Sequence, residues 1–96
     1  MVRRLIATYH PGRIYLFGSH ARGEATADSD CDLLVVVPDA TPDADRQGGR
    51  AYAALWGLGV SADVLVGTRT AFDARLHLRA SLPATVVREG TLLHAA

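Results

Sequence analysis

The sequence predicts an α/β fold of the α+β kind, a small mixed β-sheet with helices packed on it. Short runs of β-branched and aromatic residues alternate with helical patterns along the chain. The connection between the runs 30–37 and 61–66 is long and contains a helical pattern, which suits a right-handed crossover between parallel strands. The shorter connection from Gly18 to Asp30 suits an antiparallel pairing of the strands that it joins. At 96 residues, the chain is expected to be a single domain over 1–96.

The first elements are predicted by apolar spacing and turn residues. Residues 2–9 place apolar side chains at helical spacing, and the segment 10–12, "HPG", ends that helix. Residues 13–17, "RIYLF", are typical of a strand. Ser19 follows this strand and can cap a short helix over 20–24.

The next run is the strand that the sequence indicates most clearly. Over 30–37, both alternating sets of the apolar tail are hydrophobic, as expected of a central strand covered on both faces. A single helix is expected over 42–57, although Gly48 and Gly49 lower its helix propensity. The inward face of that helix would be made by Ala44, Ala51, Ala54 and Leu55. The remaining elements expected are a strand over 61–66, helices over 68–75 and 82–89, and an edge strand over 91–94.

Composition and charge exclude several classes of protein. The ten basic residues are all arginine and balance the ten acidic residues, so the formal net charge is zero. This balance argues against direct nucleic-acid binding. No apolar run is long enough to span a membrane, and residues 1–10 are too short and polar for a signal peptide, so a cytoplasmic protein is expected. Cys31 is the only cysteine, which rules out an intrachain disulfide and a thiolate zinc cluster.

Three aspartates are predicted to meet at one end of the sheet. Asp30 and Asp32 are two residues apart on a strand, so their side chains leave the same face. Asp63 lies near the start of the strand that is inferred to run parallel to the first. Carboxylates at such close range repel one another by several kcal/mol at an effective dielectric constant of about 20, and they need a cation. Because the ligand atoms are oxygens, Mg²⁺ or Mn²⁺ is favoured over zinc.

The Gly18-Ser19 pair beside this cluster is predicted to bind an anion. A helix N-terminus after a glycine offers free backbone N–H groups and the favourable end of the helix dipole. An anion site beside a two-ion carboxylate cluster is typical of phosphoryl or nucleotidyl transfer from a nucleoside triphosphate. Taken singly, each motif has an ordinary structural explanation as a turn, a cap or a surface residue, but together they favour a functional site. Arg22 either reaches a phosphate or pairs with Glu24.

The stretch "LFGSHARGEATADSDCDLLVVV", in which Gly-Ser precedes Asp-x-Asp by ten residues, resembles the signature of the nucleotidyltransferase fold shared with the DNA polymerase beta superfamily. In particular, it is similar to the minimal nucleotidyltransferases, known as MNT proteins. The resemblance covers nearly the whole chain, through Asp63 in "ADVLV" and the closing "VVREGTLLH". His20 departs from the family, whose members commonly carry arginine at this place.

The resemblance implies catalysis with two divalent ions and with ATP as substrate. Asp30 and Asp32 would hold both ions, and Asp63 would hold the ion nearer the attacking hydroxyl and help to deprotonate it. Gly18 and Ser19 would bind the β- and γ-phosphates. Proteins of this kind are commonly antitoxins that transfer AMP to a tyrosine of a HEPN-domain ribonuclease toxin. The resemblance therefore implies such a toxin as the partner of this chain.

Two alternatives stay open at this point. A neutral His20 would weaken the attraction for the triphosphate, which favours a binding module that neutralises the toxin by covering it. The second alternative keeps the enzyme but changes the acceptor to a small-molecule hydroxyl, as in the aminoglycoside nucleotidyltransferases. A chain of 96 residues is expected to provide only the nucleotide half of the site, since transfer needs both reactants held in line. This expectation disfavours a small-molecule acceptor and an unaided polymerase.

Overall fold

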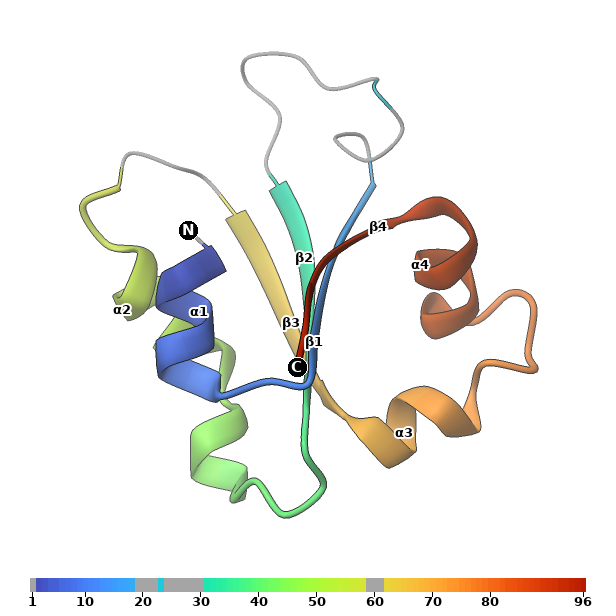
Figure 1. The fold of residues 1–96 in the computed structure, drawn as a ribbon, viewed down its shortest axis with the longest axis horizontal. Coiled ribbons are helices and arrows are strands. Elements are labelled where there is room, and N and C mark those ends of the chain that lie inside the picture. Colours follow the sequence, from blue (N-terminus) through green and yellow to red (C-terminus); the bar gives the residue numbers. More distant parts are fainter. Residues whose placement is uncertain (1, 19–22, 24–30, 59–61) are drawn as a thin grey trace.

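The computed structural model describes residues 2–18, 23, 31–58 and 62–96. Within them the elements in chain order are α1 (Val2–Tyr9), β1 (Arg13–Phe17), β2 (Cys31–Val37), the 3₁₀-helix η1 (Asp43–Arg46), α2 (Gly48–Leu55), β3 (Ala62–Thr68), α3 (Arg69–Ala74), α4 (Leu82–Glu89) and β4 (Thr91–Ala95). The described strands form one mixed sheet in the order β3-β2-β1-β4. Helices α1 and α2 lie on one side of the sheet, and α3 and α4 lie on the other (Figure 1). The predicted α/β fold is confirmed. None of the described helices is long and apolar enough to cross a membrane.

The directions of the strands agree with the lengths of their connections. β1 and β2 are antiparallel, with Phe17 opposite Asp32. β2 and β3 are parallel, with Asp32 beside Asp63. Both strand directions predicted from the connection lengths are confirmed. As a result, the end of β1 and the beginnings of β2 and β3 meet at one end of the sheet, which is uppermost in Figure 1.

Most predicted elements have the bounds expected for them. α1, β1 and α4 coincide with their predictions, and β4 is one residue longer. β3 continues to Thr68, two residues past the predicted end, because its last residues still pair with the end of β2. Apart from Gly23, a turn residue, the predicted helix over 20–24 lies outside the described residues. Its cap Ser19 and Asp30, the expected first residue of the second strand, lie outside them as well.

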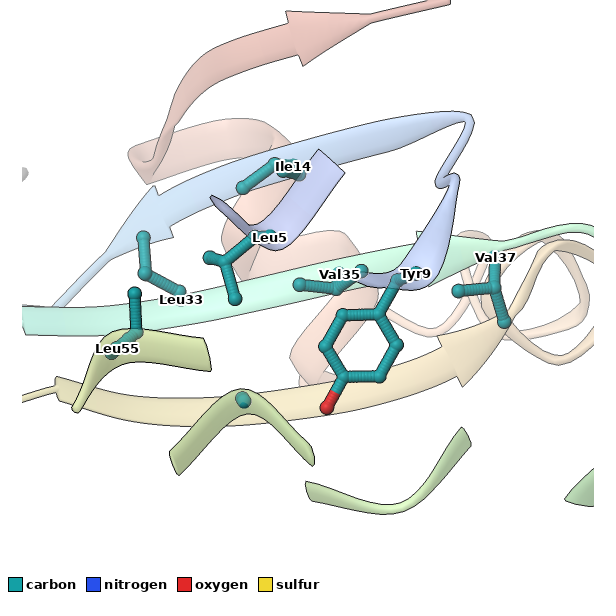
Figure 2. Packing of buried hydrophobic residues seen from close by; sticks show 8 residues of the cluster. Leu5, Tyr9, Ile14, Leu33, Val35, Val37 and Leu55 are labelled. Carbon is teal, nitrogen blue, oxygen red and sulfur yellow. The ribbon is translucent and has the colours of Figure 1, made fainter. Parts of the chain in front are cut away.

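β2 is the centre of the core because both of its faces are buried. Its last five residues are all buried, as its double apolar pattern predicted. Leu33, Val35 and Val37 pack in one cluster with Leu5 of α1 and Ile14 of β1 (Figure 2). This cluster fills the space between the sheet and the layer made by α1 and α2.

The opposite face of the sheet is covered by α3 and α4. Leu34 and Val36 form a second apolar cluster there with Tyr15, with Phe72 of α3 and with Val86 of α4. The rings of Tyr15 and Phe72 are stacked, with centroids 5.6 Å apart and planes inclined by 13°. This cluster is centred on β1 and β2, so the edge strands β3 and β4 keep exposed leucines on the same face.

Local signals set the two ends of α4. Ser81 Oγ accepts a hydrogen bond from the N–H of Ala84 at 3.3 Å, as an N-cap does. At the other end, the Gly90 N–H donates to the Val86 carbonyl at 2.7 Å. A β-carbon at Gly90 would come within 2.8 Å of the Leu16 carbonyl oxygen. Glycine at this position therefore lets the end of α4 lie close against β1.

The single helix predicted over 42–57 is wrong. The chain forms η1 and then α2, separated by Gln47, whose backbone is extended with φ −72° and ψ 133°. Gly48 and Gly49 each cost about 1 kcal/mol relative to alanine in a helix. The Gln47 carbonyl also accepts a hydrogen bond from the Tyr9 hydroxyl at 2.7 Å. The break is therefore stabilised by a residue from α1, outside the segment itself.

The break changes which side chains of this segment reach the core. Ala51 and Leu55 are buried as predicted, and Ala54 is half-buried. Ala44 was predicted to face inward and is exposed, because it lies on η1 rather than on a continuation of α2. Burial raises the pKa of Tyr9, the donor at the break, so its hydroxyl keeps its proton at neutral pH.

Leu5→Ala tests the packing of α1 on the sheet. Leu5 is 0% exposed, so its truncation should lower the free energy of unfolding by about 2–5 kcal/mol. Leu78→Ala is the matched control, because Leu78 is 50% exposed and its truncation should change stability by about 0.5 kcal/mol or less. Urea denaturation followed by circular dichroism measures both. Equal losses in the two variants would contradict this account of the core.

Asp39 joins the segment after β2 to the start of α3, and this contact predicts a pH dependence. The Thr70 hydroxyl and the Thr70 N–H both donate to the Asp39 carboxylate, the N–H at 2.9 Å. These hydrogen bonds, first that of the hydroxyl, hold the pKa of Asp39 below its ordinary value of 3.8. The carboxylate therefore contributes stability above pH 3.8 that is lost as the pH falls through its lowered pKa.

The comparison of wild type with Asp39→Asn measures this contribution. The difference in free energy of unfolding between the two proteins should be largest at neutral pH and should shrink as the pH approaches about 2. Urea titrations at a series of pH values give the difference directly. A difference that stays constant across this range would show that the carboxylate charge does not anchor α3.

Candidate functional site

Two of the predicted carboxylates lie side by side at one end of the sheet. Asp32 on β2 and Asp63 on β3 are register partners in the parallel pair. Neighbouring strands are about 4.8 Å apart, and register partners project from the same face. Because Asp32 alternates with Leu34 and Val36, this is the face that α3 and α4 partly cover. Asp32 is half-buried and Asp63 is exposed, so both carboxylates border solvent.

Gly18 brings the backbone after β1 directly against the Asp32 carboxylate. It follows Phe17, which pairs with Asp32 across the antiparallel ladder. Its φ of +75° lies in the left-handed region, which glycine adopts without steric cost. A β-carbon at Gly18 would overlap with Asp32 Oδ2. Both the backbone conformation and the space beside the carboxylate therefore require glycine at this position.

The donor set at this end of the sheet fits a hard divalent cation. Asp32 and Asp63 supply oxygen atoms, and Cys31 projects from the opposite face because side chains alternate along β2. Oxygen donors suit Mg²⁺ or Mn²⁺ rather than zinc. Like charges on adjacent strands repel each other, and a bound cation would neutralise them. The described residues contain no group of three or more His, Cys, Asp or Glu side chains that could hold a metal ion.

Several predicted site residues lie outside the described residues: Asp30, Ser19 and Arg22. The structure brings Gly18, Asp32 and Asp63 together, as the predicted topology required. Their roles in holding metal and nucleotide stay predictions, as does the position of Asp30 beside Asp32.

Leu65 is a further side chain on the same face, and no sequence motif singled it out. It lies two residues after Asp63 and is the register partner of Leu34. Leu34 is 6% exposed, whereas Leu65 is 47% exposed. The alternation in "ADVLV" would have placed Leu65 on the face of Asp63. Its exposure, in contrast, depends on how far α3 and α4 extend over the sheet, which no local pattern indicates.

Comparison with known protein families gives an independent view of this arrangement. A family model described as the nucleotidyltransferase domain matches residues 2–90, which include all the described helices and all strands but β4. A search of curated proteins found no match.

Several solved structures are similar in fold. A chain in the crystal structure of a toxin–antitoxin with AMP-PNP has a TM-score of 0.65 and 24% identity; the match covers 99% of this chain and 70% of that one. A chain of a mutant of the toxin–antitoxin MntA-HpeT has a TM-score of 0.60 and 25% identity, with 99% and 70% covered. A chain in the structure of a tri-AMPylated Shewanella oneidensis HEPN toxin in complex with MNT antitoxin has a TM-score of 0.58 and 21% identity, with 99% and 66% covered.

The family match and the site agree with each other. The match spans the turn at Gly18 and the two strands that carry Asp32 and Asp63. The neighbours share the fold over 98% of this chain or more. The chain therefore belongs to the nucleotidyltransferase domain family and is a nucleotidyltransferase.

Proposed function

We propose that this chain transfers AMP from ATP to the hydroxyl of a tyrosine on a HEPN-domain ribonuclease toxin, and that it acts in this way as an antitoxin. The observation that carries the proposal is the pairing of Asp32 with Asp63 beside Gly18 in a nucleotidyltransferase domain. The similar structures support the choice of partner and nucleotide. They include a toxin–antitoxin with AMP-PNP and an AMPylated HEPN toxin bound to an MNT antitoxin.

In this proposal the aspartates hold divalent metal ions, Mg²⁺ or Mn²⁺. Asp30 and Asp32 would contact both ions, and Asp63 would contact the ion nearer the acceptor. When bound, such ions neutralise phosphate charge and make the acceptor hydroxyl more acidic. The adjacent positions of Asp32 and Asp63 support this assignment, because a cation between the strands relieves their mutual repulsion.

The remaining residues would bind the nucleotide and move a proton. Gly18 and Ser19 offer backbone N–H groups and a hydroxyl to the β- and γ-phosphates, and Arg22 adds a positive charge near them. The acceptor oxygen forms a bond to the α-phosphorus, and the bond from that phosphorus to the bridging oxygen breaks. Pyrophosphate leaves, and Asp63 accepts the proton of the acceptor hydroxyl.

His20 is the one feature that favours a second candidate function. A neutral imidazole in place of the arginine common in the family attracts a triphosphate less strongly. The chain would then neutralise its toxin by contact, with little or no transfer. In that case, toxin inhibition would persist without ATP and with Asp32 replaced.

Asp32→Asn and Asp63→Asn should each abolish transfer of AMP, because each removes a carboxylate that the proposal places on a metal ion. Loss of the carboxylate charge and of one of its two oxygens should lower the rate by about 100-fold or more. The assay incubates the chain with α-labelled ATP, Mg²⁺ and a HEPN-domain toxin, and measures label on that protein. Labelling that persists in both variants would rule out the proposed mechanism of transfer.

A matched control for these variants is Asp73→Asn. Asp73 is an exposed carboxylate of α3 whose Oδ2 lies 3.7 Å from Arg69 Nε, and it lies outside the proposed site. Its replacement should leave labelling close to wild type. Toxin inhibition measured in the same samples distinguishes the candidate functions, since contact alone predicts full inhibition by Asp32→Asn and Asp63→Asn.

Gly18→Ala should also abolish transfer, but for a steric reason. The new β-carbon would displace the Asp32 carboxylate, and alanine would be strained at a φ of +75°. Gly57→Ala is the matched control, because Gly57 has a similar φ of +83° with no atom within 4 Å of an added β-carbon. Both variants should lose stability by about 1 kcal/mol from the backbone alone. Only Gly18→Ala should lose labelling, and equal labelling by the two variants would contradict the close contact.

A further inference from the structure

Leu65 occupies a distinct place on the sheet, beside the proposed site and outside the apolar clusters. On β3, Val64 and Val66 pack against the cluster under α1 and α2. Asp63 and Leu65 project from the other face, because side chains alternate along a strand. The cluster under α3 and α4 buries Leu34, the partner of Leu65 across the ladder, and leaves Leu65 47% exposed.

Because of the strand order, ATP and the acceptor are expected to lie on different sides of the carboxylates. Gly18 follows β1, Asp32 lies on β2, and Asp63 and Leu65 lie on the edge strand β3. The proposed phosphate contacts are therefore on the β1 side of the carboxylates, and Leu65 is on the opposite side. An apolar surface has no hydrogen-bond donor and no positive charge to bind a triphosphate, whereas it can pack against a hydrocarbon group of the acceptor.

The spacing along β3 matches the shape of a tyrosine side chain. Residues two apart on a strand are separated by about 6.6 Å. A tyrosine whose hydroxyl meets the Asp63 carboxylate can lay its ring along β3 over Leu65. A serine or threonine hydroxyl at the same place would leave Leu65 in water, because its side chain is too short to cover the leucine.

We propose that Leu65 is a specificity-determining residue that packs against the aromatic ring of the acceptor and selects tyrosine over an aliphatic hydroxyl. This inference rests on the proposed function, since it assumes AMP transfer to a protein hydroxyl at Asp63. Covering the exposed part of Leu65 would favour the tyrosine acceptor. Leu65 acts on recognition of the acceptor and leaves the binding of ATP unchanged.

The test compares Leu65→Ala with Leu92→Ala. Leu92 is 50% exposed, and it projects from the same face because it pairs with Tyr15. It lies on β4, at the opposite edge of the sheet. The two substitutions therefore remove the same atoms from similarly exposed positions on the same face, one next to Asp63 and one at the far edge of the sheet.

The assay measures AMP transfer to a HEPN-domain toxin, at varied concentrations of that protein and of ATP. Leu65→Ala should lower kcat/KM for the acceptor protein about tenfold and leave the KM for ATP unchanged. Leu65→Thr, which suits a strand, should show the same loss, and Leu65→Met should retain activity. Leu92→Ala should match wild type.

Three outcomes would overturn the inference, and they are distinguishable. If the wild type labels its partner and Leu65→Ala and Leu92→Ala have equal kcat/KM, Leu65 has no role in acceptor recognition. The proposed function would be unaffected by that result. A higher KM for ATP in Leu65→Ala and Leu65→Thr would show that the leucine contacts the nucleotide instead. A wild type that labels no HEPN-domain protein would remove the proposed function, and the inference with it.

Discussion

The parallel register between β2 and β3 is the constraint on which the rest of the structure depends. It pairs Asp32 with Asp63 and, two residues later, Leu34 with Leu65. A slip of one residue would turn every side chain of a strand to the other face. Such a slip in β2 would exchange its two apolar sets, both of which are buried, and would turn the Asp32 carboxylate toward the cluster under α1. The cost of burying a charged side chain there therefore favours the observed register.

Packing of the core thus affects the geometry of the proposed site. The two carboxylates lie on register partners, where like charges repel each other. Apolar clusters on both faces of β2 hold this strand in place. Gly18 adds a second restraint, since its backbone lies against Asp32 with no room for a β-carbon. The positions of the two carboxylates that we propose as metal ligands are thus fixed by packing and by the turn at Gly18.

Much of this arrangement could be predicted from the sequence because its signals are local. Apolar periodicity predicted α1, and the doubly hydrophobic run after Asp32 predicted a central strand. Connection lengths predicted which strands are parallel, and that topology placed Asp63 beside Asp32. These predictions used only spacing along the chain and the geometry of β-sheets.

The features that escaped prediction depend on residues far apart in the sequence. The break between η1 and α2 is stabilised by Tyr9, which lies on another helix and donates to Gln47. The exposure of Leu65 depends on how far α3 and α4 extend over the sheet. Neither effect leaves a signal within its own segment.

Paramagnetic broadening by Mn²⁺ tests the central claim most directly, because it reports which residues surround one ion. In amide spectra of the labelled protein, Mn²⁺ added below one equivalent should broaden the signals of Gly18, Asp32 and Asp63 together. It should spare Asp73, and Asp63→Asn should weaken the broadening at Asp32. Broadening at Asp32 that is unchanged in Asp63→Asn, or that leaves the Asp63 signal sharp, would contradict a shared metal site between β2 and β3.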